Sequence, residues 1–316
     1  MNAIGGYFEL ELRNGKEYHK EAIRLNTGRN ALELILKFKE YRKVFIPSYT
    51  CDVILEPFNK LGIEYEFYSI DENLEPLFNY DSIKKYEGFL YINYFGIKDS
   101  FIFNLSAICR NLIIDNSQAF FSTPNPGIPT FYSCRKFFGV TDGAYLYLDG
   151  TNTSDLRIDV SLERVGHLLK RIEYGAESGF NDFKRNENEL TGQPILSMSN
   201  LTQSILRNID YAVIKKRRRE NFLFLHNHLS ESNLLEIAFA DECVPMVYPF
   251  LTDRVELKQK LIESKIFVAT YWINVLAWTP VGSTENHLAK QLIPVPLDQR
   301  CRKDHLVTIL NVIGKQ

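Results

Sequence analysis

Residues 43–69, KVFIPSYTCDVILEPFNKLGIEYEFYS, decide the fold class of this chain. The segment starts with a run from Lys43 to Ile46 that is typical of a buried strand and ends at Pro47. A helical pattern follows over Asp52 to Leu61, and Glu64 to Ser69 is again typical of a strand. This order predicts two parallel strands joined by a covering helix.

The same alternation continues on both sides of this segment. A helix is expected before it, over Leu32 to Tyr41, and two more strands after it, over Gly88 to Tyr94 and Asn111 to Ile114. We therefore expect an α/β fold in which helices cover both faces of a mostly parallel sheet, a three-layer sandwich. Such sheets bind ligands at the carboxyl ends of their strands, so polar residues that follow strands are the candidates for a site.

The pattern changes after about Asp155, where longer polar helices replace the alternation. Residues Leu201 to Leu229 are predicted to form one long, partly exposed helix. Strands are expected over Val244 to Phe250 and Lys265 to Thr270, and helices over Val255 to Glu263 and Lys303 to Ile313. We therefore predict a large α/β domain over residues 1–210 and a small C-terminal α+β domain over residues 211–316.

Composition indicates a globular protein without a strongly charged partner. The chain has 316 residues, 45% of them hydrophobic, and a formal net charge of −2. Nucleic acids and membrane surfaces usually bind proteins with a basic excess, so neither is an expected partner. The one basic cluster, Lys215 to Arg219, lies within a helical pattern and is expected to be a solvated helix face.

Three further features bear on where the protein works. No run of about twenty apolar residues is present, which argues against a membrane-spanning helix. Residues Met1 to Gly6 lack the layout of a signal peptide. The five cysteines are scattered, and His226 and His228 would point to different faces of a helix, so neither a disulfide framework nor a metal site is expected. We expect a cytoplasmic protein.

The first candidate site is the polar turn from Leu25 to Leu32, which opens a helix. Free backbone amides and the positive end of the helix dipole make such a turn suited to binding a phosphate. Thr27, Gly28 and Arg29 would form it, and Gly28 would let the backbone approach the phosphate closely. The simpler interpretation is an ordinary helix cap, in which Asn26 or Thr27 accepts the first amides.

The second candidate follows an apolar strand, in Leu112-Ile113-Ile114-Asp115-Asn116-Ser117-Gln118-Ala119. Asp115 ends the strand, at the position where a doubly wound sheet makes its ligand contacts. Gln118 follows closely and would reach the same ligand. The alternative interpretation is that Asp115 caps the next helix.

The third candidate is the lysine of Phe131-Tyr132-Ser133-Cys134-Arg135-Lys136-Phe137-Phe138. Lys136 lies among aromatic residues, where a buried ammonium is unfavourable and tends to lose its proton. An uncharged amine is what Schiff-base chemistry requires. Ser133 could offer its hydroxyl to the phosphate of the first candidate site. Alternatively, Lys136 extends from a loop into solvent, which is the default for a single lysine.

The order and spacing of these three candidates resemble those of the DegT-type family of sugar aminotransferases, which are pyridoxal-phosphate (PLP) enzymes of fold type I. Local segments along nearly the whole chain are similar to that family's motifs, in the same order. They are Thr27-Gly28-Arg29-Asn30-Ala31-Leu32, Phe45-Ile46-Pro47-Ser48-Tyr49-Thr50, Tyr68-Ser69-Ile70-Asp71, Asp115-Asn116-Ser117-Gln118-Ala119, Ser133 and Lys136 with Asp142-Gly143-Ala144, Arg217-Arg218-Arg219-Glu220-Asn221-Phe222, and Ile293-Pro294-Val295-Pro296-Leu297-Asp298-Gln299.

The resemblance implies an aspartate-aminotransferase-like fold and a PLP cofactor. It implies that Lys136 holds the cofactor covalently and, once a substrate displaces it, moves a proton between the substrate and the cofactor. Asp115 would bind the pyridine nitrogen and keep it protonated, and Gln118 would lie beside the ring. The phosphate would be held by Thr27, by the backbone of Gly28 and Arg29, and by Ser133.

The sequence departs from the family's pattern in several respects, among them Gly143-Ala144 where the family has a pair of glycines. Cys51 stands where family members usually have an aromatic residue against the cofactor ring, and Tyr49 is the alternative source of stacking. The family's Gly-Asn-Tyr-Arg segment, whose Asn reaches the phosphate of a second subunit, has no match between Ser178 and Met198. Lys136 is retained, whereas dehydratase relatives replace this lysine with histidine.

The resemblance therefore predicts a PLP-dependent aminotransferase, with glutamate as the first candidate donor and a nucleotide-linked keto sugar as one candidate acceptor. Tyr94 and Trp272 are candidates for substrate contacts, although aromatic residues at such positions are more often core. A homodimer is implied as well.

Two alternatives stay open. One is another PLP-dependent reaction on the same fold, such as dehydration, racemisation or decarboxylation. The other is an inactive relative that serves as a binding or regulatory protein.

Overall fold

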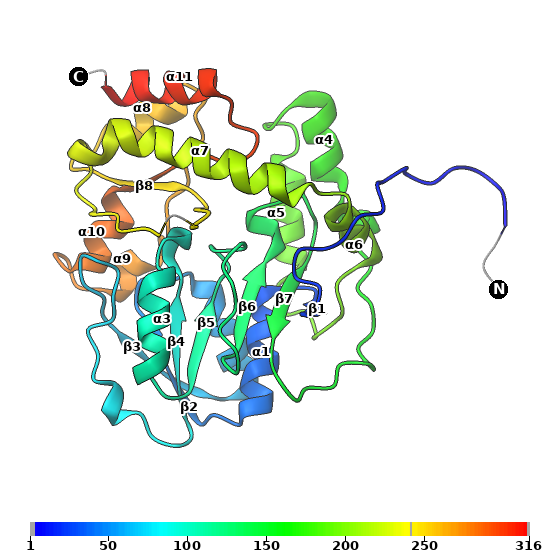
Figure 1. Ribbon diagram of the computed structural model, residues 1–316, viewed down its shortest axis with the longest axis horizontal. Coiled ribbons are helices and arrows are strands. Elements are labelled where there is room, and N and C mark those ends of the chain that lie inside the picture. Colours follow the sequence, from blue (N-terminus) through cyan, green and yellow to red (C-terminus); the bar gives the residue numbers. More distant parts are fainter. Residues whose placement is uncertain (1–3, 241, 315–316) are drawn as a thin grey trace.

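The computed structural model describes residues 4–240 and 242–314. Its central feature is a seven-stranded sheet with the strand order β1-β7-β6-β5-β4-β2-β3 (Figure 1). The strands are β1 (Ile23–Leu25), β2 (Lys43–Pro47), β3 (Glu64–Tyr68), β4 (Glu87–Ile92), β5 (Leu112–Asp115), β6 (Thr130–Ser133) and β7 (Ala144–Tyr147). Strands β2 to β6 pair in parallel, whereas β7 is antiparallel to both β6 and β1. The predicted mostly parallel sheet is confirmed.

The strand–helix–strand unit predicted over residues 43–69 is present. Strands β2 and β3 are its two parallel members. Between them, Asp52–Ile54 forms a short 3-10 turn and Leu55–Leu61 forms helix α2. The helix ends at Gly62, which adopts the left-handed conformation with φ of 66°, as helix-terminating glycines commonly do.

Helix α1 (Gly28–Lys39) begins before the expected Leu32. The reason is Thr27, whose side chain accepts the backbone amide of Asn30 at 3.1 Å and so caps the helix one turn early. The helix packs against β6 and β7 (Figure 1). Its early start brings Gly28 into the first turn, close to the carboxyl ends of the parallel strands.

The single helix predicted over Leu201 to Leu229 is instead two helices, α6 (Asn200–Arg207) and α7 (Tyr211–Leu229). The prediction is wrong because Asp210 accepts the backbone amide of Val213 at 3.1 Å and so starts a new helix. Helix α7 then lies across the molecule (Figure 1).

The C-terminal region is smaller and mixed. Strands β8 (Tyr248–Leu251) and β9 (Leu292–Val295) pair antiparallel. The strand predicted over Lys265 to Thr270 is wrong, because Lys265 has a left-handed φ of 59° and the backbone amide of Ile266 bonds the carbonyl of Leu261 at 2.9 Å. That segment is thereby held at the end of a helix rather than beside another strand. The helices here are α8 (Leu257–Glu263), α9 (Val275–Trp278), α10 (Thr284–Gln291) and α11 (Lys303–Gly314).

One hydrophobic core runs through both regions of the chain. It includes Ile114 on β5, Phe222 on α7 and Leu306 on α11, each 1% exposed. The predicted domain boundary at residue 210 coincides with the break before α7, and the division into two domains stays a prediction.

The basic cluster Lys215 to Arg219 is only partly a solvated helix face. Arg217 is exposed, but Arg218 is 1% exposed. The guanidinium of Arg218 donates to two backbone carbonyl oxygens, at 3.1 and 3.3 Å, and to Oε1 of Gln299 at 3.0 Å. These acceptors offset the burial of the charge. The expectation of a wholly solvated cluster is therefore wrong for Arg218, because its partners come from distant parts of the sequence.

In the part of the chain that the structure describes, no helix is long and apolar enough to cross a membrane. The N-terminal residues from Ile4 onward project from the body (Figure 1), and Ile4, Tyr7 and Phe8 are 95%, 98% and 92% exposed. Residues 1–3, which belong to the segment assessed for a signal peptide, lie outside the described residues.

Candidate functional site

A cavity of about 250 Å³ opens at the edge of the sheet where β4, β5 and β6 end. Asp115, the last residue of β5, pairs in register with Ile92 of β4 and Phe131 of β6, and all three line the cavity. The lining also includes every residue that the sequence predicted for cofactor binding, namely Thr27, Gly28, Arg29, Cys51, Asp115, Gln118, Ser133 and Lys136. The fold thus brings these residues together, while their roles stay predictions.

The predicted phosphate-binding turn is the first turn of α1. Thr27 caps the helix, as the simpler interpretation held, and it also lines the cavity. The two roles are compatible, because a hydroxyl accepts and donates at once. Gly28 also lines the cavity, and a Cβ added there would be in van der Waals contact with Oγ of Ser117 at 3.7 Å and with the ring of Phe131 at 3.8 Å. The unbonded amides of this turn therefore lie at the wall of the cavity, where they could bind an anion.

Asp115 supplies a buried carboxylate at the floor of the cavity. It is 9% exposed, and its Oδ1 accepts the backbone amide of Ser117 at 2.7 Å. The carboxylate closes a turn, because no helix follows directly, so the alternative of a helix cap is not realised. Burial raises the pKa of Asp115, and the positive charge of Lys136 and the hydrogen bonds from Ser117 oppose that shift. A cation bound next to this carboxylate would favour its ionised form further.

Lys136 ends a short 3-10 turn, Cys134–Lys136, that directly follows β6. The residue is exposed, so the expectation of a lysine buried among aromatic rings is wrong. The neighbouring Phe137 and Phe138 turn instead into a separate core cluster with Phe120. Lys136 lines two adjoining cavities, and its charge is close enough to Asp115 to influence the pKa of that carboxyl.

Gln118 and Cys51 also contribute to the cavity wall. Gln118 is 2% exposed, and its Oε1 accepts the backbone amide of Phe95 at 2.7 Å. With the oxygen held, Nε2 is the group of this side chain that could reach a ligand. Burial raises the pKa of the Cys51 thiol. A protonated thiol behaves as a small apolar group, so Cys51 offers contact where an aromatic ring would offer stacking.

Of the aromatic candidates, Trp272 lines the cavity and Tyr94 and Tyr49 do not. Both tyrosines are fully buried, and the hydroxyl of Tyr94 donates to the carbonyl oxygen of Tyr49 at 2.9 Å. The ring of Trp272 meets that of Tyr49 edge-on, with 4.8 Å between centroids. Tyr94 packs in the core of this structure, and the predicted roles of Tyr94 as a substrate contact and of Tyr49 as a source of stacking stay predictions. Trp272 stays a candidate for a substrate contact.

Sequence reasoning missed Ser117, Arg135 and Glu187, which line the same cavity. Ser117 and Arg135 are close in sequence to predicted residues, so their positions alone could have suggested them. Glu187 carries no such signal, because helix α5 (Phe180–Glu189) reaches the cavity only through the tertiary fold.

The stretch after α5 contacts Arg29, a residue of the cavity lining. Thr191 accepts a hydrogen bond from Arg29 at 3.2 Å, and the backbone amide of Gly192 donates to Glu56 at 3.0 Å. Arg29 and Glu56 are themselves ion-paired at 2.7 Å. This stretch lies within residues 178–198, where the sequence has no match for the family's partner-reaching segment. In this chain it makes hydrogen bonds to Arg29 and Glu56 of the same chain.

A second cavity, of about 670 Å³, adjoins the first. The two share Gln118, Arg135, Lys136 and Trp272 in their linings. The second cavity also receives side chains from helix α4 (Gly166–Tyr174) and from the C-terminal region. A large ligand could therefore extend from the Lys136 cavity toward the C-terminal region.

Two arginines lie together at this second cavity. Burial lowers the pKa of Arg171, and the nearby Arg300 lowers it further. Arg300 forms an ion pair with Asp298 at 2.7 Å. A pair of guanidinium groups with one adjacent carboxylate is an arrangement that suits an anionic ligand group.

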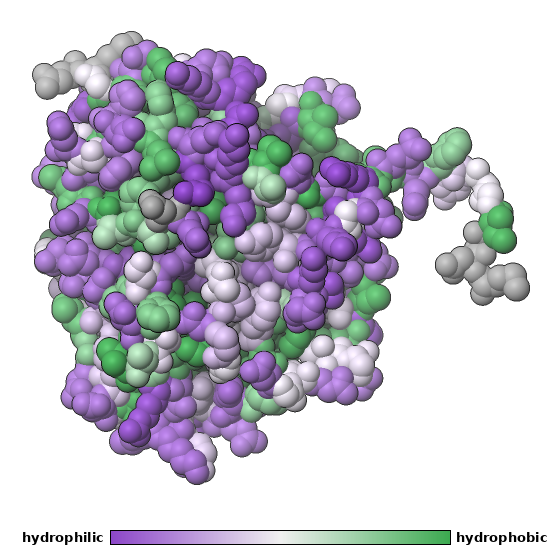
Figure 2. All heavy atoms as spheres, in the orientation of Figure 1, coloured by the Kyte–Doolittle hydropathy of each residue, from purple (hydrophilic) through white to green (hydrophobic). Residues whose placement is uncertain are grey.

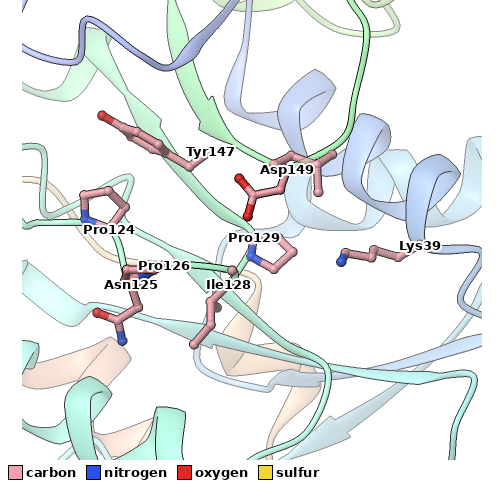
Figure 3. A pocket seen from close by; sticks show the side chains of 10 residues that line it. Lys39, Pro124, Asn125, Pro126, Ile128, Pro129, Tyr147 and Asp149 are labelled. Carbon is pink, nitrogen blue, oxygen red and sulfur yellow. The ribbon is translucent and has the colours of Figure 1, made fainter.

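A third cavity, of about 240 Å³, lies at the opposite edge of the sheet, before the start of β6 (Figure 3). Pro124, Pro126 and Pro129 form much of its wall, and its titratable groups are Lys39, Tyr147 and Asp149. Open α/β sheets bind ligands at the carboxyl ends of their strands, and the convergent polar groups lie there too. We therefore assign the candidate site to the Lys136 cavity.

No protein-family model and no curated protein matches this chain. Solved structures do match it over most of its length. A sugar aminotransferase from Micromonospora echinospora is 15% identical, with a TM-score of 0.64 over 92% of this chain and 86% of the other. DesV from S. venezuelae, solved in complex with a ketimine intermediate, is 17% identical, with a TM-score of 0.64 over 92% and 83%.

A third solved structure broadens the range of chemistry found on this architecture. GDP-4-keto-6-deoxy-D-mannose-3-dehydratase from E. coli, solved with bound hydrated PLP, is 14% identical, with a TM-score of 0.64 over 93% of this chain and 87% of the other. At this level of identity the similarity shows the fold. The chain therefore has the aspartate-aminotransferase-like α/β architecture of these solved sugar aminotransferases, as its sequence predicted.

Proposed function

We propose that this chain is a PLP-dependent aminotransferase that transfers an amino group to a keto sugar. One observation carries the proposal: a single cavity, at the carboxyl edge of the sheet, is lined by an amine (Lys136), a carboxylate (Asp115) and a helix turn suited to an anion (Gly28). The fold that the chain shares with solved sugar aminotransferases supports the same reaction class. Glutamate is the first candidate for the amino donor.

The cavity residues fit PLP at both ends. Gly28 in the first turn of α1 and Ser133 line the same cavity, so both could hold the phosphate together with Thr27 and Arg29. Asp115 would pair with the pyridine nitrogen, and Gln118 could reach the ring through Nε2. Bound there, PLP would supply an electron sink for a carbanion formed beside the substrate's nitrogen.

Lys136 would be the residue that carries the proton. Its Nζ would hold the cofactor covalently until a substrate amine displaces it. The freed amine would then be the group that takes the proton leaving the substrate carbon and holds it beside the cofactor. Asp115 would keep the ring nitrogen protonated, and its burial would strengthen the interaction between the two charges.

The second cavity supports a large acceptor with an anionic group. It opens directly from the Lys136 cavity, and Arg171 and Arg300 lie within it. A keto sugar bound near Lys136 could extend a phosphate-bearing substituent toward these arginines. A nucleotide-linked keto sugar is therefore the first acceptor to test.

Two alternative functions follow from particular observations. Dehydration on the same fold is one, because a PLP-binding sugar dehydratase has a similar structure. The retained Lys136 favours amino transfer, since dehydratase relatives of the family that the sequence resembles carry histidine there. An inactive relative with a binding role is the other, motivated by the segment that has no match between residues 178 and 198.

We further propose a cytoplasmic homodimer. The five dispersed free cysteines support a reducing compartment. The projecting N-terminal arm carries exposed hydrophobic residues (Figure 2). Exposed apolar side chains often mark protein–protein interfaces, so the arm supports contact with a second subunit. Exposed Ile172, Tyr174 and Phe180 add a second apolar area on and near α4.

The proposal is tested by the absorbance of the purified protein after PLP is added. We expect a band at the edge of the visible range that borohydride reduction removes, with the cofactor then fixed to Lys136 in a peptide map. Lys136→Ala should lose the band and the fixed adduct. Lys39→Ala, at the third cavity on the opposite edge of the sheet, should keep both. A wild-type protein that forms no band would overturn the proposal.

A further inference from the structure

Arg135 is a cationic residue of the Lys136 cavity that the proposed function leaves without a role. It lies in the short turn between β6 and Lys136, and its side chain is 17% exposed. Its Nε is buried and has no hydrogen-bond partner among the described residues. Burial lowers the pKa of Arg135 to about 10, and the nearby charge of Arg29 contributes to the shift. This guanidinium therefore has one donor, Nε, without a partner among the described residues.

Arg29 and Arg135 differ in how firmly their carboxylate partners are held. Arg29 pairs with Glu56, and Glu56 also accepts the backbone amide of Gly192 at 3.0 Å, with its side chain 20% exposed. Arg135 pairs with Glu187, whose side chain is 42% exposed. Glu187 can thus rotate toward water more readily than Glu56. Arg135 is therefore the arginine whose partner a ligand could replace.

The proposed phosphate-binding residues lie in the same cavity as the ion pair of Arg135 and Glu187. Gly28 and Ser133, which the proposed function assigns to the phosphate, line the cavity together with Arg135 and Glu187. A dianionic phosphate there would bring more negative charge than the single carboxylate of Glu187. It would also accept from the guanidinium in the paired geometry that arginine favours.

We propose that Arg135 is a binding residue for the phosphate group of the ligand, and that Glu187 occupies its guanidinium until the phosphate displaces it. The identification of that phosphate with PLP rests on the proposed function. The displaced Glu187 carboxylate would turn to solvent, and the buried Nε of Arg135 would gain an acceptor. The step is an exchange of ion-pair partners, with no bond made or broken.

The proposal predicts opposite effects for the two partners. Arg135→Gln should weaken binding of inorganic phosphate and of PLP by roughly 10- to 100-fold, the range expected for loss of a charge-assisted hydrogen bond. Glu187→Gln should tighten binding of inorganic phosphate several-fold, because the competing carboxylate is gone. Binding of pyridoxal, which lacks the phosphate, should change little in either variant. Dissociation constants come from titrations followed by calorimetry for phosphate and by absorbance for the two aldehydes.

Matched controls come from helix α5 itself. Arg185→Gln and Glu189→Gln remove exposed members of a surface ion pair on the same helix, and neither residue lines the cavity. Both should bind phosphate as the wild type does. If Arg135→Gln does not fold, Arg135→Lys replaces it. That variant keeps the charge, loses the paired geometry and should show an intermediate loss.

Three results would overturn the inference. One is an unchanged phosphate constant in Arg135→Gln, and another is weaker phosphate binding in Glu187→Gln. The third is an equal loss for PLP and pyridoxal, which would indicate a general distortion. The proposed function is tested separately by the Lys136 absorbance band with pyridoxal alone. Phosphate bound through Arg135 without such a band would contradict the proposed function and leave this inference standing.

Discussion

Asp115 is the residue on which the proposed chemistry depends most directly after Lys136. Asp115→Asn keeps an oxygen for the amide of Ser117 but removes the negative charge beside the ring nitrogen. We expect PLP to bind and the amino-transfer half-reaction to slow by roughly 10²-fold, the scale of losing one well-placed electrostatic group. Rapid mixing of the PLP-loaded protein with glutamate measures that rate. An unchanged rate would show that Asp115 does not tune the ring.

The same substitution, although it should slow the reaction, should raise the stability of the ligand-free protein at neutral pH. Burial raises the pKa of Asp115 in the folded state above that of the unfolded chain, about 3.9. Between these two values the folded state holds the proton more tightly, so its stability falls as pH rises through that window. Asp115→Asn lacks this group and should be more stable than the wild type at neutral pH.

Denaturant unfolding of the ligand-free proteins at several pH values checks this expectation. The advantage of Asp115→Asn should shrink as pH falls to about 3.9 and below. The carboxyl of Asp115 then becomes protonated in the unfolded chain as well as in the folded one, so folding no longer changes its protonation. Asp149→Asn, at an exposed position by the third cavity, should show no comparable pH-dependent gain. A wild type more stable than Asp115→Asn at neutral pH would contradict the argument.

Single residues could be predicted where a local pattern carried the signal. Asp115 follows an apolar strand and Gly28 opens a helix, and both line the cavity as the pattern indicated. The environment of Lys136 could not be predicted, because aromatic neighbours in sequence turn into another cluster in the fold. Glu187 was out of reach for a related reason. Its helix comes to the cavity from about fifty residues later in the chain, without a local motif.

At the scale of elements, Arg218 is the feature of α7 with the clearest energetic consequence. Arg218→Met keeps much of the packing but leaves two carbonyl oxygens and Gln299 without their donor. It also removes a cation–π contact with Phe137, whose ring centroid lies 4.6 Å away. We expect a loss of about 2–4 kcal/mol in the free energy of unfolding.

The neighbouring arginine on the same helix provides the control. Arg217 is exposed, so Arg217→Met should change the free energy of unfolding by less than about 0.5 kcal/mol. Denaturant unfolding of both variants gives the comparison. Similar values for the two would mean that the contacts of Arg218 are not stabilising.

Element types were easier to predict than element ends. Strand β2 and helix α11 lie where the patterns placed them, because runs of apolar residues set their position. The early start of α1 and the break before α7 depend on Thr27 and Asp210, single side chains that bond backbone amides. The apolar pattern shows such caps poorly, since the hydrophobic spacing runs on through residues 208–210.

At the scale of the whole molecule, the sheet could be predicted from the sequence. How the N-terminal and C-terminal regions pack against each other could not. Parallel strands follow from short apolar runs separated by helices, and this pattern is strong in the first half of the chain. The second cavity could not be predicted in this way. Its wall combines Arg171 from α4 with Arg300 from near the C-terminus, and only packing of the two regions brings them together.

Binding of PLP should be measurable as a property of the whole fold, and it separates the functional alternatives. A ligand that binds only the folded state at about 100 times its dissociation constant adds about 2.7 kcal/mol of stability. For a chain of this size that corresponds to a rise in the melting temperature of roughly 5 °C.

A rise together with a borohydride-fixed adduct at Lys136 supports the enzyme. A rise without the adduct would favour a binding protein, because folded-state affinity would persist without the covalent chemistry that amino transfer needs. The absence of any rise would contradict PLP as the ligand of this cavity.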